Sequence, residues 1–451
     1  MYALIDSNNF FVSCERLFRP DIEGKPVVVL SSNDGCVISR SAEAKALGIP
    51  MGAPIFKHRE LFSSHGVVTL SANFELYGDI SERIATLLTS ITPRIELYSI
   101  DEAFLDLDNL NIIDYDAWGK KVRNIMLKNI GIPVSIGTAP TKTLCKLANL
   151  WAKNHGDTEG VVSLEPRERT TPQHNPRTAL AQTEAPYAAD PYLLTLAAVD
   201  IADVWGVGWR LTPKLRAEGI YTALDLALMR PQYAQQLMGV HGRHMVYELN
   251  GTRCLPLQAH TKPQQMISRG RQFGKDTNDF TVIEAAIASL ASNAVRELRR
   301  EQQLAGSAAV VLRTNRLKPN YLRTHATVRF AIPTADTGGI CSELVQSVRT
   351  TFRTGAHYHK ADVTLYGLSS SLALQVDMLG GPNRLAAHHT SQARMRAVDA
   401  LNNKFGPRAV RPAAELLSNA WRPRSSMLSP RYTSDWSELP ECKAIRLGSL
   451  Q

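Results

Sequence analysis

The sequence predicts an α+β protein with several domains. The chain has 451 residues, which is too many for one compact core. Short apolar runs alternate with segments of helical periodicity in the first third, and strand-like runs flank a helix within residues 266–368. Hydrophobic residues make up 44% and charged residues 21%, which is ordinary for a chain that buries a core.

The N-terminal third predicts a sheet whose strands and helices follow a defined order. Residues 2–5 are apolar and predict a buried strand that ends at Asp6, where turn-forming residues follow. Periodicity then predicts a helix at 73–91, two strands joined by a polar turn within 94–107, a helix at 118–130, a strand at 133–137 and a helix at 141–153. This is the order of a split β-α-β, or ferredoxin-like, arrangement, in which the strand ending at Asp6 lies beside the hairpin that turns at Asp101.

The remaining segments are more varied. Residues 19–65 contain four prolines and several glycines, which predict a small, irregular module. Residues 167–190 are rich in Pro, Thr, Ala and Gln and are expected to form a linker or exposed loop, followed by a mostly helical stretch to about residue 257. The chain becomes polar after residue 368, so a loosely packed tail is expected there.

Charge and cysteine content narrow the function classes. The 51 Lys and Arg residues exceed the 42 Asp and Glu residues, and the net charge of +9 suits a polyanionic partner without requiring one. The six cysteines include no CxxC pair, which argues against a zinc site or a disulfide framework and favours a reducing compartment. The start reaches Asp6 too early for a signal peptide, and no apolar run is long enough for a bilayer, so we expect a cytoplasmic protein without a membrane partner.

Three carboxylates are candidates for metal binding. Asp6 ends a predicted strand, and Asp101 and Glu102 share the tip of the predicted hairpin. Phosphoryl transfer to a 3′-hydroxyl uses two divalent ions about 4 Å apart, and hard cations such as Mg²⁺ prefer carboxylate oxygens on rigid strands. The alternative is that Asp-Glu at a hairpin tip is ordinary turn chemistry.

Two adjacent aromatic residues follow the first carboxylate. Phe10 and Phe11 come directly after the polar turn at Asp6, where large aromatic side chains are unusual. A flat ring beneath a nucleotide sugar would clash with a 2′-hydroxyl and so select deoxyribose. The alternative is that both are core residues, and we expect at least one of them to be buried.

Long segments of the chain resemble a known family. The segments DSNNFFVSCE, YSIDEAFLDL and SIGTAPTKTLCKLANLWAK resemble the three signature segments of Y-family DNA polymerases. Three further segments are similar to those of the UmuC branch of this family, which contains the catalytic subunit of bacterial DNA polymerase V. They are NDGCVISRSAEAKALGIPMG, ANFELYGDIS and MLSPRYTSDW. The resemblance runs from residue 1 into the C-terminal tail and is interrupted mainly at residues 167–190.

The resemblance implies a right-hand polymerase fold. It places a ferredoxin-like palm at 1–19 and 71–166, small fingers at 20–70, a linker and helical thumb at 167–257, an α+β little finger at 258–370 and a tail for protein partners at 371–451. The implied function is error-prone, template-directed DNA synthesis past lesions, with transfer from a dNTP to a primer 3′-OH and two Mg²⁺ ions. A catalytically inactive DNA-binding scaffold in DNA repair is the alternative, and a structure-specific nuclease is a further one.

The resemblance also assigns residues to the site. Asp6, Asp101 and Glu102 become the catalytic, metal-binding carboxylates, with the Ser7 carbonyl as a further ligand. Phe11 falls at the position that selects the sugar, beside Phe10, and Lys45 and Lys153 fall where the triphosphate binds. Solvated helix cations are the alternative for the lysines, and Lys142 and Lys146 share a helix face on which phosphate contact is plausible.

DNA and protein partners follow from the same comparison. Gly206 and Gly208 belong to a predicted helix-hairpin-helix whose backbone amides approach a DNA phosphate. Residues 261–330 hold twelve Lys or Arg against five Asp or Glu, which predicts salt-sensitive DNA binding unless this is simply a solvated basic face. The basic residues on or near its strands are Arg269, Arg271, Arg313, Arg316, Lys318, Arg323 and Arg329. Gln375, Met378 and Leu379 resemble a peptide that docks on the sliding clamp. Beyond primer-template DNA and dNTPs, the UmuC branch implies a UmuD-like processed accessory dimer and the RecA filament as partners.

Overall fold

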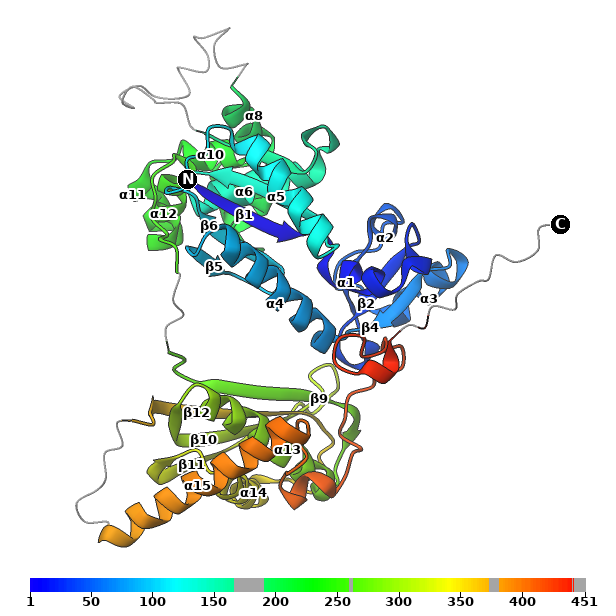
Figure 1. Cartoon of the computed structure of the whole chain (residues 1–451), viewed down its shortest axis with the longest axis vertical. Coiled ribbons are helices and arrows are strands. Elements are labelled where there is room, and N and C mark those ends of the chain that lie inside the picture. The colour runs from blue at the N-terminus through cyan, green and yellow to red at the C-terminus, as the bar shows by residue number, and fades with distance from the viewer. Residues whose placement is uncertain (166–189, 259–262, 373–380, 440, 442–451) are drawn as a thin grey trace, which may run out of the picture. The chain divides into compact units, whose positions relative to one another are not determined.

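The computed structural model describes residues 1–165, 190–258, 263–372, 381–439 and 441. Contacts divide the chain into two units. Unit 1 comprises residues 1–29, 37–261 and 428–451, and unit 2 comprises residues 30–36 and 262–427 (Figure 1). The C-terminal tail therefore contributes to both units, because the chain passes from unit 2 to unit 1 after Met427.

The main sheet of unit 1 has five strands in the order β5-β6-β1-β7-β8. Their bounds are β1 Tyr2–Ser7, β5 Ile95–Leu97, β6 Glu102–Asp106, β7 Val134–Ala139 and β8 Val161–Ser163. The central strand β1 pairs antiparallel with β6 on one side and β7 on the other, and Asp6 lies opposite Glu102. This register confirms the expected neighbourhood of the two segments.

Helices cover both faces of this sheet (Figure 1). They are α1 Phe10–Phe18, α4 Phe74–Ile91, α5 Tyr115–Asn129 and α6 Lys142–Asn154. Alternate residues of β1 point to opposite faces: Leu4 packs into the cluster that contains α6, and Ile5 packs into the cluster that contains α1, α4 and α5. All six residues of β1 are buried, so the strand that carries Asp6 is held rigidly on both faces.

Gly137 of β7 allows α6 to approach the sheet closely. A Cβ at this position would lie 2.4 Å from the backbone nitrogen of Asn149 and 2.4 Å from the backbone oxygen of Cys145, both in α6. We expect Gly137→Ala to lower the free energy of unfolding by at least about 1–3 kcal/mol, because the backbone of α6 must shift. Gly78→Ala is the control, because nothing lies within 4 Å of a Cβ at this position. Replacing a glycine within a helix should raise the free energy of unfolding by about 0.5–1 kcal/mol. Urea unfolding checks both, and equal stability of the two variants would contradict this packing.

Two smaller groups of elements complete unit 1. A three-stranded sheet of order β3-β2-β4, where an irregular module was expected, comprises β2 Val27–Leu30, β3 Val37–Arg40 and β4 Val68–Ser71, with helices α2 Ala42–Ala46 and α3 Ile55–Ser64. The expected helical stretch contains α8 Pro191–Ala198, α9 Leu211–Ala217, α10 Ala223–Ala227, α11 Pro231–Met238 and α12 Val240–Leu249. Strands of only four residues joined by short loops show little periodicity in the sequence, which explains why this small sheet was not predicted.

Unit 2 is built on an antiparallel sheet of order β11-β10-β12-β9. Its strands are β9 Ile267–Thr277, β10 Gln303–Thr314, β11 Arg323–Thr334 and β12 Tyr358–Ser370, and its helices are α13 Phe280–Arg300, α14 Thr337–Thr351 and α15 Gly381–Phe405. Residues of α13 and α14 pack against one face of the sheet. Among the described helices of the chain, none is both long and apolar enough to cross a membrane.

The expectation of a loosely packed tail was wrong for the described residues. Helix α15 is joined to α13 by a bidentate ion pair between Arg299 and Asp399, in which both N–O distances are 2.7 Å. Trp421 is 6% exposed in the core of unit 2, and Tyr432 is 6% exposed in the core of unit 1. These contacts join segments far apart in sequence, so local composition did not reveal them.

Candidate active site

Strand pairing places the three predicted acidic residues at the same end of the sheet. Asp6 lies near the end of β1, directly opposite Glu102 at the start of β6. Asp101 precedes Glu102, and its carbonyl accepts a hydrogen bond of 2.9 Å from the Ser7 backbone N–H. The end of β1 is thereby fixed against the hairpin tip, as the sequence predicted.

Lysines of α6 reach two of these carboxylates. Lys153 Nζ lies 2.5 Å from Asp6 Oδ2, and Lys146 Nζ lies 2.7 and 2.8 Å from the two oxygens of Glu102. The two lysines are two helical turns apart, so they share the face of α6 that borders the site. The Asp101 side chain is bound differently: its Oδ1 accepts a hydrogen bond of 2.5 Å from Ser99 Oγ.

Lys142 does not belong to this group. Its ammonium is buried, 2.5 Å from Glu96 Oε2 and 2.9 Å from the Pro256 carbonyl oxygen. The expectation that Lys142 contacts phosphate was therefore wrong, because its charge is already neutralised within the fold. Breaking a buried ion pair is costly, which assigns Lys142 a structural role.

The electrostatics of the site favour an added cation. Burial raises the pKa of Asp6 to about 7, and the Lys153 ammonium offsets this only in part. Burial also opposes the ionisation of Glu102, but hydrogen bonds from Asp6 and Lys146 hold its pKa below the usual range. A divalent cation beside these carboxylates would stabilise the ionised form of both.

The donor chemistry fits a hard divalent metal. Asp6, Asp101 and Glu102 offer carboxylate oxygens from adjoining strand ends, and the neighbouring Ser7 Oγ is buried without a hydrogen-bond partner. In the part of the chain that the structure describes, no three His, Cys, Asp or Glu side chains are gathered tightly around one point. The ammonium groups of Lys146 and Lys153 lie against the carboxylates instead, so metal binding requires these flexible side chains to turn away.

A second lysine lies near Asp6, and an arginine lies near that lysine. Lys45 of α2 is exposed, and incomplete solvation together with the positive charges of Arg40 and Lys153 lowers its pKa. Lys45 and Lys153 near Asp6, with Arg40 next to Lys45, form a place for a polyanion. The sequence did not predict a role for Arg40, because an arginine at a strand end resembles a solvated surface residue. Its position five residues before Lys45 was the only signal that it belongs to the site.

One of the two adjacent aromatic residues is buried, as expected. Phe10 is 3% exposed and belongs to the core, whereas Phe11 is partly exposed. The Phe11 ring stacks on Tyr77 of α4, with centroids 4.5 Å apart and planes inclined by 14°, and Phe74 meets it edge-on. Tyr77 was not singled out in the sequence, because it reads as one more apolar position of a helix.

The predicted hairpin glycines lie between two helical turns. Gly206 and Gly208 separate a 3-10 turn at Ile201–Asp203 from α9. Gly206 has φ of 94°, a conformation that L side chains rarely adopt, so a glycine is required at this turn. Gly208 is exposed, and a Cβ there would meet nothing within 4 Å.

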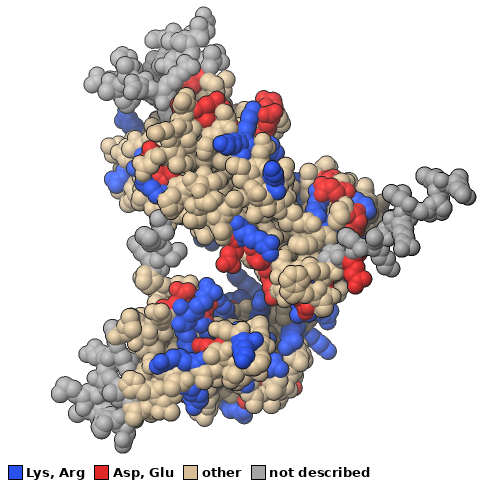
Figure 2. All heavy atoms as spheres, in the orientation of Figure 1, with Lys and Arg blue, Asp and Glu red and all other residues tan. Residues whose placement is uncertain are grey.

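The sheet of unit 2 has one basic face. Residues of β10 that alternate with its buried positions share a face with their partners on β11 and β12. This open face is defined by Arg313, Arg323, Arg329 and Lys360, with Asp362 among them, and Figure 2 shows Lys and Arg gathering over unit 2. Arg313 and Lys360 both pair with Asp362, whereas Arg323 and Arg329 are exposed.

The other predicted DNA contacts are placed differently. Arg269 pairs with Glu297 of α13, so it has a partner within unit 2 on the helix-covered side. Arg271 is exposed on β9, and Arg316 is exposed at the turn between β10 and β11. The predicted clamp-binding residues Gln375, Met378 and Leu379 lie outside the described residues.

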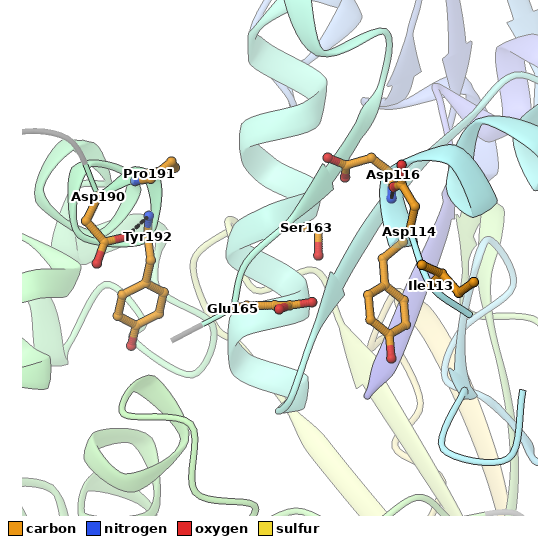
Figure 3. Close-up of a pocket in the computed structure, with 9 residues that line it drawn as sticks. Ile113, Asp114, Asp116, Ser163, Glu165, Asp190, Pro191 and Tyr192 are labelled. Atoms are coloured by element: carbon orange, nitrogen blue, oxygen red, sulfur yellow. Dashed lines mark hydrogen bonds between the residues drawn. The ribbon is translucent and has the colours of Figure 1, made fainter. Parts of the chain in front are cut away.

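A separate cavity of about 460 Å³ lies in unit 1 (Figure 3). It is acidic, with Asp114, Asp116, Glu165 and Asp190 in its lining. Asp114 caps the start of α5, and Asp190 caps the start of α8 by accepting a hydrogen bond of 3.1 Å from Tyr192 N–H. Two of its carboxylates thus serve helix ends, and none of the three predicted metal ligands lies in the cavity.

Comparison with known proteins identifies the family. Residues 5–149 match the impB/mucB/samB family, residues 264–378 match the C-terminal domain of that family, and residues 392–442 match a domain of unknown function (DUF4113). Protein UmuC of Salmonella typhimurium is 38% identical over 98% of this chain and 100% of its own length. The chain is a Y-family DNA polymerase of the UmuC branch. Proteins SamB and ImpB of Salmonella typhimurium, each 34% identical over at least 98% of this chain and 100% of their own length, belong to the same branch.

Solved structures show that the Y-family fold is shared. A Y-family DNA polymerase chimera of Dbh and Dpo4 aligns with 82% of this chain and 99% of its own, with a TM-score of 0.61 and 21% sequence identity. A post-insertion binary complex of Dbh DNA polymerase gives a TM-score of 0.53 at 20% identity, over 82% of this chain and 99% of its own. The resemblance read from the sequence is therefore confirmed: the chain is a translesion polymerase with an α+β multidomain fold, and the inactive scaffold is not supported.

Proposed function

We propose that this Y-family polymerase joins a dNTP to a primer 3′-OH at Asp6, Asp101 and Glu102. Two Mg²⁺ ions would be held by these carboxylates and by the Ser7 carbonyl. The β1–β6 register, which sets Asp6 opposite Glu102 with Asp101 beside it, is the observation that supports this most directly. When bound, such ions lower the pKa of the attacking hydroxyl and neutralise charge on the triphosphate.

Lys153, Lys45 and Arg40 would bind the triphosphate. Lys153 and Lys45 lie near Asp6, Arg40 lies near Lys45, and a polyanion is the ligand that offsets their mutual repulsion. Transfer of the Lys153 ammonium from Asp6 to a phosphate would leave the carboxylate free for a cation. Lys146 would leave Glu102 in the same way, so that substrate entry and metal binding favour one another.

Phe11 would select the sugar. Its ring is partly exposed and stacks on Tyr77, and Phe10 anchors the start of the same helix in the core. A rigid ring beneath the sugar leaves no room for a 2′-hydroxyl, so deoxyribonucleotides are preferred.

The open face of unit 2 and the Gly206–Gly208 hairpin would hold primer-template DNA without reading its sequence. Phosphate contacts by arginines release counterions, so each contact adds about 0.9 to the slope of log affinity against log salt. The double change Arg323→Ala with Arg329→Ala is expected to reduce the slope by about two. Arg300→Ala, an exposed cation on α13, is the control for lost charge. Fluorescence anisotropy over a salt series measures both, and an unchanged slope in the double variant would contradict DNA binding at this face.

Low accuracy and lesion bypass follow from the small module of β2, β3 and β4. A short three-stranded sheet with two short helices offers little surface to check the shape of the new base pair. As partners we propose a UmuD-like processed accessory dimer, the RecA filament and the sliding clamp, the last bound by Gln375, Met378 and Leu379. Work on chromosomal DNA would place the protein in the cytoplasm, at the nucleoid.

Primer extension tests this function. Wild-type protein with Mg²⁺ and all four dNTPs is expected to lengthen a primer past an abasic template site. Omitting the dNTPs separates the polymerase from a nuclease, which would shorten the primer instead. If the wild-type protein alone does not extend the primer, the accessory dimer and the RecA filament are added. Absence of extension in their presence would contradict the proposal.

A further inference from the structure

A segment of the C-terminal tail packs against α1 and the start of α4. Residues 428–432, which we name the strap, lie in unit 1 together with β1, α1 and α4. Leu428 forms an isolated parallel bridge with Ser71, and Tyr432 stacks on Phe18 of α1 with centroids 4.6 Å apart and planes inclined by 6°. Two separate contacts therefore attach the strap to the catalytic unit.

Between these contacts, Ser429 enters a buried polar cluster. Ser429 Oγ donates a hydrogen bond of 3.1 Å to Glu15 Oε1, and Tyr77 OH donates one of 2.7 Å to the same oxygen. Asn73 Nδ2 donates to Ser429 Oγ at 3.0 Å, while Asn73 Oδ1 caps the start of α4 by accepting from Leu76 N–H. The strap thus binds both the start of α4 and the carboxyl group that holds Tyr77.

The cluster depends on its hydroxyl groups. Glu15 is fully buried, and its Oε2 has no hydrogen-bond partner. Burial raises the pKa of Glu15, while the hydrogen bonds from Tyr77 and Ser429 act in the opposite direction. Because a buried carboxyl group without partners is costly, loss of either hydroxyl would allow Glu15 and its neighbours to shift.

The cluster ends at the proposed sugar-selecting residue. Tyr77 is fully buried and stacks on Phe11, so the position of the Tyr77 ring determines how far the Phe11 ring can tilt. We propose that the strap positions Phe11 through Ser429, Glu15 and Tyr77, and thereby sets how strictly the polymerase rejects ribonucleotides. Ser429 and Glu15 are positioning residues, since neither touches substrate. This inference rests on the proposed role of Phe11, and it assigns a task to part of the tail domain whose function is unknown.

The test compares dNTP and rNTP incorporation by Ser429→Ala and wild type. The ratio of kcat/KM for dNTP to that for rNTP is expected to fall about fivefold, because a buried acceptor loses one donor. The change should appear as a lower KM or a higher kcat for rNTP, with kcat for dNTP nearly unchanged, whereas general damage would lower kcat for both. Ser429→Thr keeps the hydroxyl and should restore the ratio, and Ser434→Ala, an exposed serine of the same tail, should leave it unchanged.

A second background separates the strap from the role of Phe11. With Phe11→Ala present, Ser429→Ala should no longer change the ratio, because the residue being positioned is gone. A fall in the ratio that persists in this background, or an unchanged ratio in the single Ser429→Ala variant, would overturn the strap proposal. An unchanged ratio in Phe11→Ala alone would instead overturn the proposed role of Phe11, and the strap proposal with it. Tyr77→Phe keeps the ring and removes the other hydroxyl, so it should reproduce the effect if Ser429→Ala does not fold.

Discussion

Asp101→Asn is expected to reduce primer extension on the order of a thousandfold, because a neutral amide is a poor ligand for a divalent ion that contributes several kcal/mol. The fold should survive the change. The Asp101 side chain is partly exposed and accepts one hydrogen bond from Ser99, which an asparagine oxygen can also accept. Single-turnover extension with Mg²⁺ and dNTPs measures the loss, and circular dichroism checks the fold.

The control for this change is Asp157→Asn. Asp157 is an exposed aspartate in the turn after α6, so its substitution alters net charge equally. It should extend primers like wild type. Equal extension by Asp101→Asn and Asp157→Asn would show that the assigned carboxylate is not part of the catalytic centre.

Phe11→Ala is expected to give the second largest effect, a gain of ribonucleotide use. Discrimination against rNTPs should fall about 100-fold, because steric rejection of one small group is typically worth about 10- to 200-fold. Incorporation of dNTPs should change much less, since the ring excludes the 2′-hydroxyl and makes no contact that the deoxyribose requires. Steady-state kinetics of single dNTP and rNTP additions measure the ratio.

Phe56→Ala provides the matched control for Phe11→Ala. Phe56 is an aromatic residue of α3 that is 66% exposed. Its loss should leave sugar discrimination unchanged. If Phe11→Ala rejects ribonucleotides as strictly as Phe56→Ala does, the sugar must be read by another part of the site.

The sequence predicted the catalytic centre because its signals are local. An apolar strand ending at Asp6 and a polar hairpin tip at Asp101 and Glu102 each show in a short window, and strand order then brings them together. The long helices α4, α5 and α6 were predicted for the same reason, since their periodicity is strong.

Features that depend on distant contacts could not be read in this way. Lys142 and Lys146 share a helix face, but only Lys142 meets Glu96 in the interior, a partner that lies 46 residues away in the sequence. In the sequence, nothing distinguishes Phe10 from Phe11. In the structure, the backbone turns at Asn9, with φ of 49°, and the Phe10 ring lies in the core. Ser429 lies in a polar tail without periodicity, and its hydrogen bond to Glu15 spans 414 residues.

Nucleotide transfer at Asp6, Asp101 and Glu102 requires that these residues bind metal ions, and metal binding can be measured without catalysis. Paramagnetic resonance with Mn²⁺ counts the ions bound to a complex of the protein, primer-template DNA and a non-hydrolysable dNTP. Wild type should hold about two Mn²⁺ ions that depend on the bound nucleotide, and Asp101→Asn should hold at least one fewer while still binding DNA. No bound Mn²⁺ in the wild-type complex, or the same number in both proteins, would contradict the assigned centre.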